Sequence, residues 1–168
     1  MTAITQEPNP VLRQVAAPVA ASDIGSDRLN DIIARMKTAL AGEDDGVAIA
    51  APQIGESLQL FVVSRRISKK FMKELEDDLV FINPEIIRLG KKKEDMSEGC
   101  LSVRWKYGLV KRSVTATVRA LNDQGNEFVM SGSGLLAQIF QHETDHLNGI
   151  LFIDKAHHVE DRPPHEQH

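Results

Sequence analysis

The stretch SGSGLLAQIFQHETDHLNG, residues 131–149, has the spacing of a long helix and ends at Gly149, a typical helix stop. Its apolar side chains spread around much of the helical circumference. A helix that is apolar on most sides is buried in a protein core. The stretch therefore predicts a buried helix whose apolar residues are Leu135, Leu136, Ile139, Phe140 and Leu147.

The same helix carries His142, Glu143 and His146 in the pattern H-E-x-x-H. Side chains at positions i and i+4 share one face of a helix, about 5–6 Å apart at Cβ. Both imidazoles can therefore reach one ion at roughly 2.0–2.1 Å. Glu143 then lies beside the ion, where a general base can take a proton from a water molecule on the metal. The alternative is a buried helix with two hydrogen-bonded histidines, although buried ionisable side chains are costly unless they are paired or bind a metal.

Two histidines alone do not make a catalytic metal site, because such sites use three protein ligands. Downstream, the chain offers His157 and His158, which stand in a polar tail where histidines are expected at the surface. Cys100, in the stretch EGCLS, is the other choice. A lone cysteine is often a small buried hydrophobe, but this one follows a charged loop in a turn-like stretch. The residues alone leave Cys100 equally open as a ligand and as a core residue.

The composition indicates a globular domain. The chain has 168 residues, of which 42% are hydrophobic, and no apolar run is long enough to span a membrane. The net charge is -4 with both signs interspersed, and the absence of a basic stripe argues against direct DNA binding. The N-terminus lacks the features of a secretory or organellar address, and a single cysteine excludes an intrachain disulfide. We therefore expect one cytoplasmic domain over residues 1–168, with no membrane contact.

Periodicity predicts a second helix and several strands elsewhere in the chain. The helix covers residues 26–42, with Ser26 as the N-cap and Gly42 as the stop. Strands are expected at residues 58–63, 79–89, 113–121 and 127–130, the last two as a hairpin. Irregular or charged segments are expected at residues 1–25, 64–78 and 91–95, with a mobile tail from about residue 157.

Three separated motifs follow one another along the chain: GVAIAAPQ at residues 46–53, EGCLS at residues 98–102 and QHETDHLNG at residues 141–149. In this order they resemble the signature motifs of the peptide deformylase family, and the similarity runs from about Asn9 to Ile153. The resemblance implies an α+β fold in which antiparallel β-sheets pack around a central helix that carries H-E-x-x-H.

The resemblance also implies a metal site and its ligands. Cys100, His142 and His146 match the family's metal ligands, which would answer the question of the third ligand. Fe(II) would be the metal in the cell, and zinc, nickel or cobalt could occupy the site in purified protein. A thiolate ligand suits Fe(II) but leaves the site open to oxidation.

The implied reaction removes the formyl group from the N-terminal formyl-methionine of nascent peptides and releases formate. The resemblance also implies that the protein contacts the ribosome transiently. Glu143 matches the family's catalytic carboxylate, and the Gln53 amide with the Leu101 N–H matches its carbonyl-polarising pair. Taken alone, Gln53 also fits a surface glutamine. The expected substrate contacts are Gly46, Val47, Ala48, Glu98 and Gly99.

Two competing functions share parts of this pattern. A metalloprotease would have the same helix but not the cysteine of EGCLS. A catalytically weak or silent deformylase-like protein that binds formylated N-termini would have lost Glu143, Gln53 or a ligand, and all of these are present.

Two places depart from the family pattern. Ala48 stands where the family usually has glycine. Because the β-branched neighbours Val47 and Ile49 favour an extended backbone, we expect a negative φ at Ala48 and a slightly tighter cleft. Residues 104–107 stand where family members often have a proline. They could line the path by which the substrate leaves or form a loop at the rim of the cleft, and we expect the rim loop.

Overall fold

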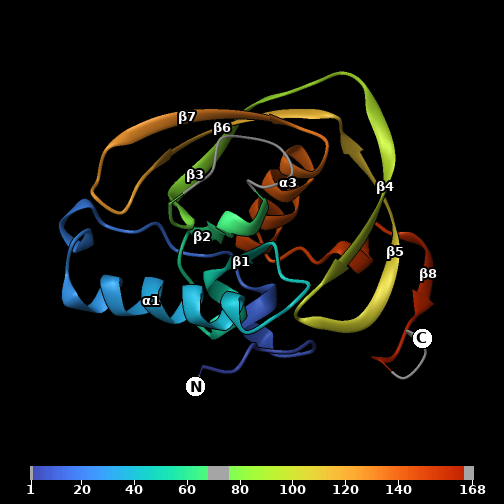
Figure 1. The fold of residues 1–168 in the computed structure, drawn as a ribbon, viewed down its shortest axis with the longest axis horizontal. Helices are drawn as coiled ribbons and strands as arrows, with labels where there is room; N and C mark the ends of the chain where they lie inside the picture. The colour runs from blue at the N-terminus through green and yellow to red at the C-terminus, as the bar shows by residue number, and fades with distance from the viewer. Residues whose placement is uncertain (1, 68–75, 165–168) are drawn as a thin grey trace.

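The structure is a computed structural model that describes residues 2–67 and 76–164. In these residues two β-sheets, in which neighbouring strands run antiparallel, surround one of two α-helices (Figure 1). The surrounded helix carries H-E-x-x-H. The predicted α+β class and central helix are therefore confirmed.

The helix α1 (Asp27–Ala41) forms as predicted. The Ser26 hydroxyl accepts a hydrogen bond from the Leu29 N–H at 3.2 Å, and Gly42 follows the last turn. All members of the predicted apolar stripe are buried: Leu29, Ile32, Ile33, Met36 and Leu40.

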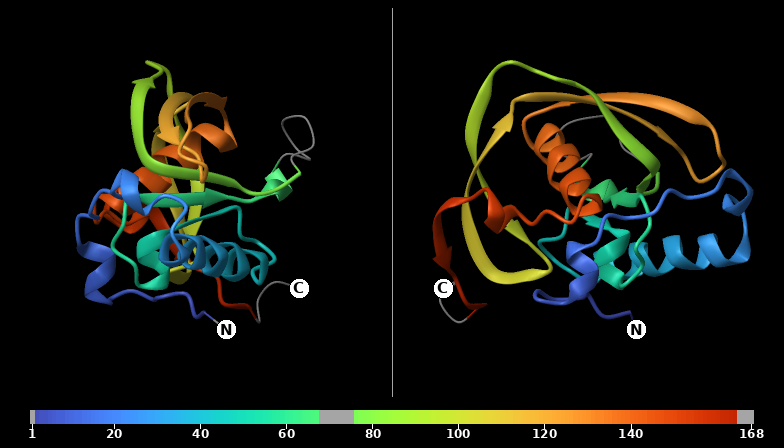
Figure 2. Two further views of the ribbon diagram at one scale, coloured as in Figure 1. Left: turned by 90° about the vertical axis from the view of Figure 1, so that its left-hand side faces the viewer. Right: turned by 180° about the vertical axis from the view of Figure 1, so that it is seen from behind.

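The central helix α3 (Leu135–Leu147) begins later than the sequence predicted. Residues 131–133 continue strand β7 (Glu127–Ser133), and Gly134, with φ 58°, turns the chain into the helix. α3 packs against the larger sheet and stays at the centre of the molecule in each view (Figures 1 and 2). Its buried apolar residues are Leu136, Ala137, Ile139, Phe140 and Leu147.

The larger sheet has the strand order β1-β2-β3-β6-β7. The first two strands, and residues 79–82 at the start of the third, are continuous apolar runs because both of their faces are covered. Phe61 and Phe81 pack in the cluster that contains α3, whereas Leu60, Val62 and Ile82 pack in the cluster that contains α1. Its strands, besides β7, are β1 (Ala48–Ala50), β2 (Leu60–Val63), β3 (Leu79–Leu89) and β6 (Thr115–Leu121).

The smaller sheet contains β4 (Lys93–Cys100), β5 (Val103–Ser113) and β8 (His157–Asp161), in the order β4-β5-β8. The sequence did not predict this sheet. The turn expected at residues 91–95 lies partly in β4, and the rim loop expected at residues 104–107 is part of β5. Residues 157–161, at the start of the tail, form β8. These segments are largely polar because they are exposed, so they lack the apolar alternation that marks a half-buried strand.

Residues 2–25 form an irregular arm, as predicted. The Asn83 side chain holds this arm through two hydrogen bonds. Its Oδ1 accepts the Val19 N–H at 2.8 Å, and its amide nitrogen donates to the Val19 carbonyl at 2.9 Å. The charged segment predicted at residues 64–78 lies largely outside the described residues. No helix in the described part of the chain is long and apolar enough to cross a membrane. The 3-10 turns are η1 (Pro10–Arg13), η2 (Ala21–Asp23), η3 (Ala51–Ile54), η4 (Arg65–Ile67) and η5 (Phe152–Asp154).

Candidate active site

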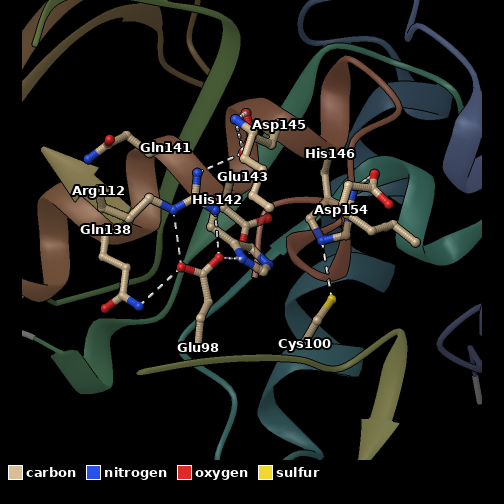
Figure 3. A network of polar contacts seen from close by, with 12 residues as sticks. Glu98, Cys100, Arg112, Gln138, Gln141, His142, Glu143, Asp145, His146 and Asp154 are labelled. Carbon is tan, nitrogen blue, oxygen red and sulfur yellow. Dashed lines mark hydrogen bonds and ion pairs between the residues drawn. The ribbon is translucent and has the colours of Figure 1, made fainter. Parts of the chain in front are cut away.

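Three side chains that can bind a metal meet between β4 and α3. Cys100 ends β4, while His142 and His146 lie one turn apart on α3, and their ligand atoms all lie within 4.8 Å of one another. The Cys100 Sγ is 3.3 Å from the His146 Nε2 (Figure 3). With metal–ligand bonds of about 2.0–2.3 Å, a tetrahedral ion would hold its ligand atoms roughly 3.3–3.6 Å apart. The Cys100–His146 separation therefore already matches that of a small tetrahedral ion, and all three ligand atoms are close enough to be candidates for one ion.

The imidazole of His142 is oriented by Glu98, a neighbour of Cys100 on β4. The Glu98 Oε1 lies 2.5 Å from the His142 Nδ1, which leaves the Nε2 of this ring for a metal. Glu98 is itself held by the Arg112 guanidinium at 2.6 and 3.1 Å and by the Gln138 amide at 3.2 Å. Such a carboxylate–histidine pair fixes the ring and raises its basicity as a ligand.

The Arg112 guanidinium joins β5 to α3 at the same place. Besides its bonds to Glu98, it donates to the Asp145 carboxylate at 2.7 Å (Figure 3). The side chains of Arg112 and Glu98 are only 3% and 4% exposed. A buried charge of this kind is tolerated only when it is paired and hydrogen-bonded, and this network meets that condition.

The surroundings of the two histidines shift their pKa values in opposite directions. Burial works to lower the pKa of His142, but hydrogen bonds to Cys100 and Glu98 raise it well above the ordinary value. Burial lowers the pKa of His146, whose Nδ1 has no hydrogen-bond partner among the described residues. A proton and a metal ion compete for the Nε2 of His142, so metal binding there would release a proton.

Glu143 is a buried carboxylate beside this cluster. Its Oε1 lies 3.9 Å from the His142 Nε2, and its Oε2 has no hydrogen-bond partner among the described residues. Burial raises the pKa of Glu143 to about 7. By contrast, burial works to raise the pKa of Glu98, but the bonds with His142 and Arg112 bring it down to about 2. A carboxyl group with a pKa near 7 can both accept and return a proton at neutral pH.

Gln53 is aimed at the cluster from η3. Its Oε1 accepts the Ala50 N–H at 2.9 Å, so its amide nitrogen turns the other way, donating to the Ser102 hydroxyl at 3.1 Å and lying 3.7 Å from the Cys100 Sγ. Gln53 is 1% exposed, so the surface interpretation of this residue is wrong.

A pocket of about 600 Å³ opens over these residues. One wall comes from the loop that leads into β1, another from the end of β4, and α3 closes the inner side. His146 is buried and does not line the pocket. The other residues singled out from the sequence do: Gly46, Val47, Ala48, Gln53, Glu98, Gly99, Cys100, Leu101, His142 and Glu143.

Comparison with known proteins assigns the chain to a family. The family model described as polypeptide deformylase matches residues 1–162. The chain belongs to the polypeptide deformylase family. Curated proteins named peptide deformylase include those of Natranaerobius thermophilus, 40% identical over 90% of this chain and 89% of the relative, and Halothermothrix orenii, 43% identical over 88% of both. At this similarity the chain is an enzyme, a hydrolase of the deformylase family.

Solved deformylase structures have the same fold. An actinonin-bound class I type b peptide deformylase from Acinetobacter baumannii superposes with a TM-score of 0.82 at 33% identity, covering 94% of this chain and 99% of that one. A deformylase from Legionella pneumophila gives a TM-score of 0.81 at 36% identity, covering 99% and 89%. Another Acinetobacter baumannii structure, bound to Met-Ala-Ser, gives 0.81 at 33% identity, covering 92% and 99%.

Several residues around the deformylase motifs were missed from the sequence. Arg112 and Asp145 complete the Glu98 network, and Gln6 of the arm donates to the Leu101 carbonyl at 2.8 Å. The one available signal was Glu98 itself, because a carboxylate beside a buried ligand needs a cation. Glu98 was expected to contact the substrate. It lines the pocket, but its carboxylate oxygens are already bonded to Arg112, Gln138 and His142.

Two further expectations meet the structure of this deformylase. Among the described non-glycine residues, only Asn83 and His158 have a positive φ, so the expected negative φ at Ala48 is confirmed. His157 and His158 lie exposed on β8, with the His157 Nε2 3.5 Å from Asp95, and do not join the ligand cluster. The surface interpretation of these two histidines is confirmed.

Proposed function

We propose that this enzyme hydrolyses the formyl group of N-terminal formyl-methionine on nascent peptides and releases formate, using a metal held by Cys100, His142 and His146. The observation that carries the proposal is the meeting of three ligand atoms within 4.8 Å beside a buried carboxylate, in a pocket large enough for a peptide end. Because nascent peptides are made in the cytoplasm, we also propose a cytoplasmic location and transient contact with the ribosome.

The donor set suits Fe(II), zinc, nickel or cobalt, since one thiolate and two imidazoles bind borderline metals. We propose Fe(II) in the cell, with the other metals able to replace it. When bound, the ion would polarise the formyl carbonyl and make water a better nucleophile. Glu98 supports this role, because it holds the Nδ1 side of His142 and leaves the Nε2 free.

We assign the proton transfers to Glu143. Its carboxylate takes a proton from the water that attacks the formyl carbon, and it then gives this proton to the amine when the carbon–nitrogen bond breaks. The products are formate and a peptide with a free amino terminus. Burial supports this assignment, because it raises the pKa of Glu143 to about 7 and so eases both transfers.

Gln53 and the Leu101 N–H are assigned to the oxygen of the formyl group. Negative charge develops on this oxygen during attack, and fixed donors in a buried site stabilise it more than water would. The hydrogen bond from the Ala50 N–H to the Gln53 Oε1 at 2.9 Å supports the assignment, because it turns the amide donors toward Cys100 and Ser102.

The peptide itself is proposed to lie along the wall that contains Gly46, Val47 and Ala48, with Gly99 opposite. An extended peptide can add to exposed backbone as a strand. The structure of the Acinetobacter baumannii relative bound to Met-Ala-Ser supports a peptide as the ligand of this pocket.

The test is formate release from formyl-Met-Ala-Ser by protein purified without oxygen, with metal content measured on the same sample. We expect turnover that disappears when the metal is removed by a chelator and returns when Fe(II) is added. Peptide binding without formate release, at full metal occupancy, would instead favour a silent binder of formylated N-termini.

A further inference from the structure

The pocket continues outward past the ligand cluster to a group of ring side chains. Trp105, Tyr107 and Pro164 line this outer end. Trp105 is 36% exposed, and the Tyr107 ring covers the backbone of Gly99, where an added Cβ would lie 2.7 Å from the ring. Two rings come from β5 and the third from the segment that follows β8, so distant parts of the chain meet here.

The segment after β8 is held beside the pocket by several contacts. β8 pairs with β5, with Tyr107 opposite Glu160. Beyond the strand, the Arg162 N–H donates to the Trp105 carbonyl at 2.7 Å, and the Arg162 guanidinium lies 5.6 Å from the Tyr107 ring centroid. These contacts bring Pro164 to the lining of the pocket.

The basic side chains at this end are paired with carboxylates of the chain itself. The pairs are Arg104 with Glu43, Lys106 with Asp161, and Arg162 with Glu160. A peptide that reaches this end therefore meets ring side chains and paired cations, among them the Arg104 guanidinium, which lies 4.8 Å from the Trp105 ring centroid. Ring faces bury large areas and favour apolar or aromatic partners.

We propose that Trp105, Tyr107 and Pro164 form a distal subsite for an apolar or aromatic side chain of the peptide, downstream of the methionine. Residues 162–164 form the outer wall of this distal subsite. The inference rests on the proposed function, and it makes the C-terminal segment a determinant of peptide preference.

The first test compares formyl-Met-Ala-Phe and formyl-Met-Ala-Ser-Phe with matched peptides in which serine replaces phenylalanine. In the parent chain we expect the better of the two phenylalanine peptides to have a KM roughly 3- to 10-fold lower than its serine counterpart. This is the effect of one ring contact. A chain that stops after Asp161 should lose this preference. A chain that stops after Pro164 is the matched control and should keep it.

The second test uses Pro164→Gly in the full-length chain, which keeps β8 and should lose part of the preference. Trp105 is the single tryptophan, so its fluorescence reports peptide at the distal subsite without turnover. We expect unformylated Met-Ala-Ser-Phe to change this fluorescence more than Met-Ala-Ser-Ser does.

Three outcomes would overturn the distal subsite. The first is an equal rise in KM for phenylalanine and serine peptides when the chain stops after Asp161. The second is a lower KM for the phenylalanine peptides in that shortened chain. The third is an equal fluorescence change for both unformylated peptides. A fluorescence preference in a parent chain that releases no formate would support the subsite and count against the proposed function.

Discussion

Glu98 and Glu143 are both buried at the active site, but their partners give them opposite acid–base character. Glu98 is paired with Arg112 and His142 and has a pKa of about 2, so it stays charged and orients a ring. Among the described residues, the Oε2 of Glu143 has no hydrogen-bond partner, and burial raises the pKa of Glu143 to about 7. The two carboxylates are thus suited to separate roles, because their environments move their pKa values apart.

The first prediction concerns a single residue, in the variant Glu143→Gln. Because Glu143 lies beside the ligand cluster and is not part of it, the variant should keep its metal and lose formate release by roughly 10²-fold or more. Metal content and formate release are measured on the same preparation. Glu85→Gln, which changes an exposed glutamate, is the control and should behave like the parent. Retained turnover at full metal occupancy would remove Glu143 from the mechanism.

The second prediction concerns Cys100→Ser. A hydroxyl is a poor substitute for a thiolate, so the variant should bind zinc and Fe(II) more weakly than the parent. Metal affinity is measured by competition with a chelator, and mild peroxide should inactivate the parent in its iron form. If the serine variant bound both metals like the parent, Cys100 would not be a ligand.

Between elements, the Arg112 guanidinium is the link that holds β4, β5 and α3 in one arrangement. It comes from β5 and reaches Glu98 on β4 and Asp145 on α3. The proposed metal ligands Cys100 and His142 lie on the same two elements as its partners. Their separation therefore depends on a contact made by a residue outside the three motifs.

The third prediction is that Arg112→Leu destabilises the protein by about 3–5 kcal/mol, because it leaves the Glu98 carboxylate buried without its cation. Denaturant unfolding measures this loss. Arg119→Leu removes an exposed arginine that pairs with Glu85, and it should cost about 1 kcal/mol or less. Equal losses of unfolding free energy in the two variants would show that burial of the Arg112 pair adds nothing to the cost of removing its arginine.

Across the whole molecule, the N-terminal arm is bound to the last residue of α3 and to the segment that follows it. Arg13 in η1 donates to Asp154 in η5 at 2.5 and 3.1 Å, and the Ala16 N–H donates to the Leu147 carbonyl at 2.9 Å. The hydrogen bond from Arg13 lowers the pKa of Asp154 below its ordinary value of 3.8. Both side chains are more than one-third exposed, so solvent screens the pair.

The fourth prediction follows from the sign of this shift. A carboxyl group with a lowered folded-state pKa stabilises the fold above its unfolded-state pKa, and this stabilisation is lost as the pH falls through the folded-state pKa. Arg13→Gln should therefore lower the free energy of unfolding by about 1 kcal/mol or less at pH 7. The difference from the parent should shrink once the pH falls below 3.8. Denaturant unfolding from pH 7 to pH 3 measures it, and a difference that is independent of pH would contradict the pairing.

Features that depend on neighbours in the chain were predictable from the sequence. The limits of α1 follow from the Ser26 cap and the Gly42 stop, and β3 covers the predicted residues 79–89. The position of His142 and His146 on one face of α3 follows from the helical repeat. Each of these is set by contacts within a few residues, so a local pattern contains the necessary information.

Features that depend on distant neighbours were decided by the tertiary structure. β8 forms because the backbone of β5 offers hydrogen-bonding groups to a polar segment, and such pairing leaves little mark on side-chain pattern. The meeting of Cys100 with the two histidines, and of Glu98 with Arg112, likewise depends on how the hairpin of β4 and β5 packs on α3. Residue type and spacing thus determined which groups could do the chemistry. Packing between elements decided how those groups are oriented, what charge they hold and which distant segment borders the pocket.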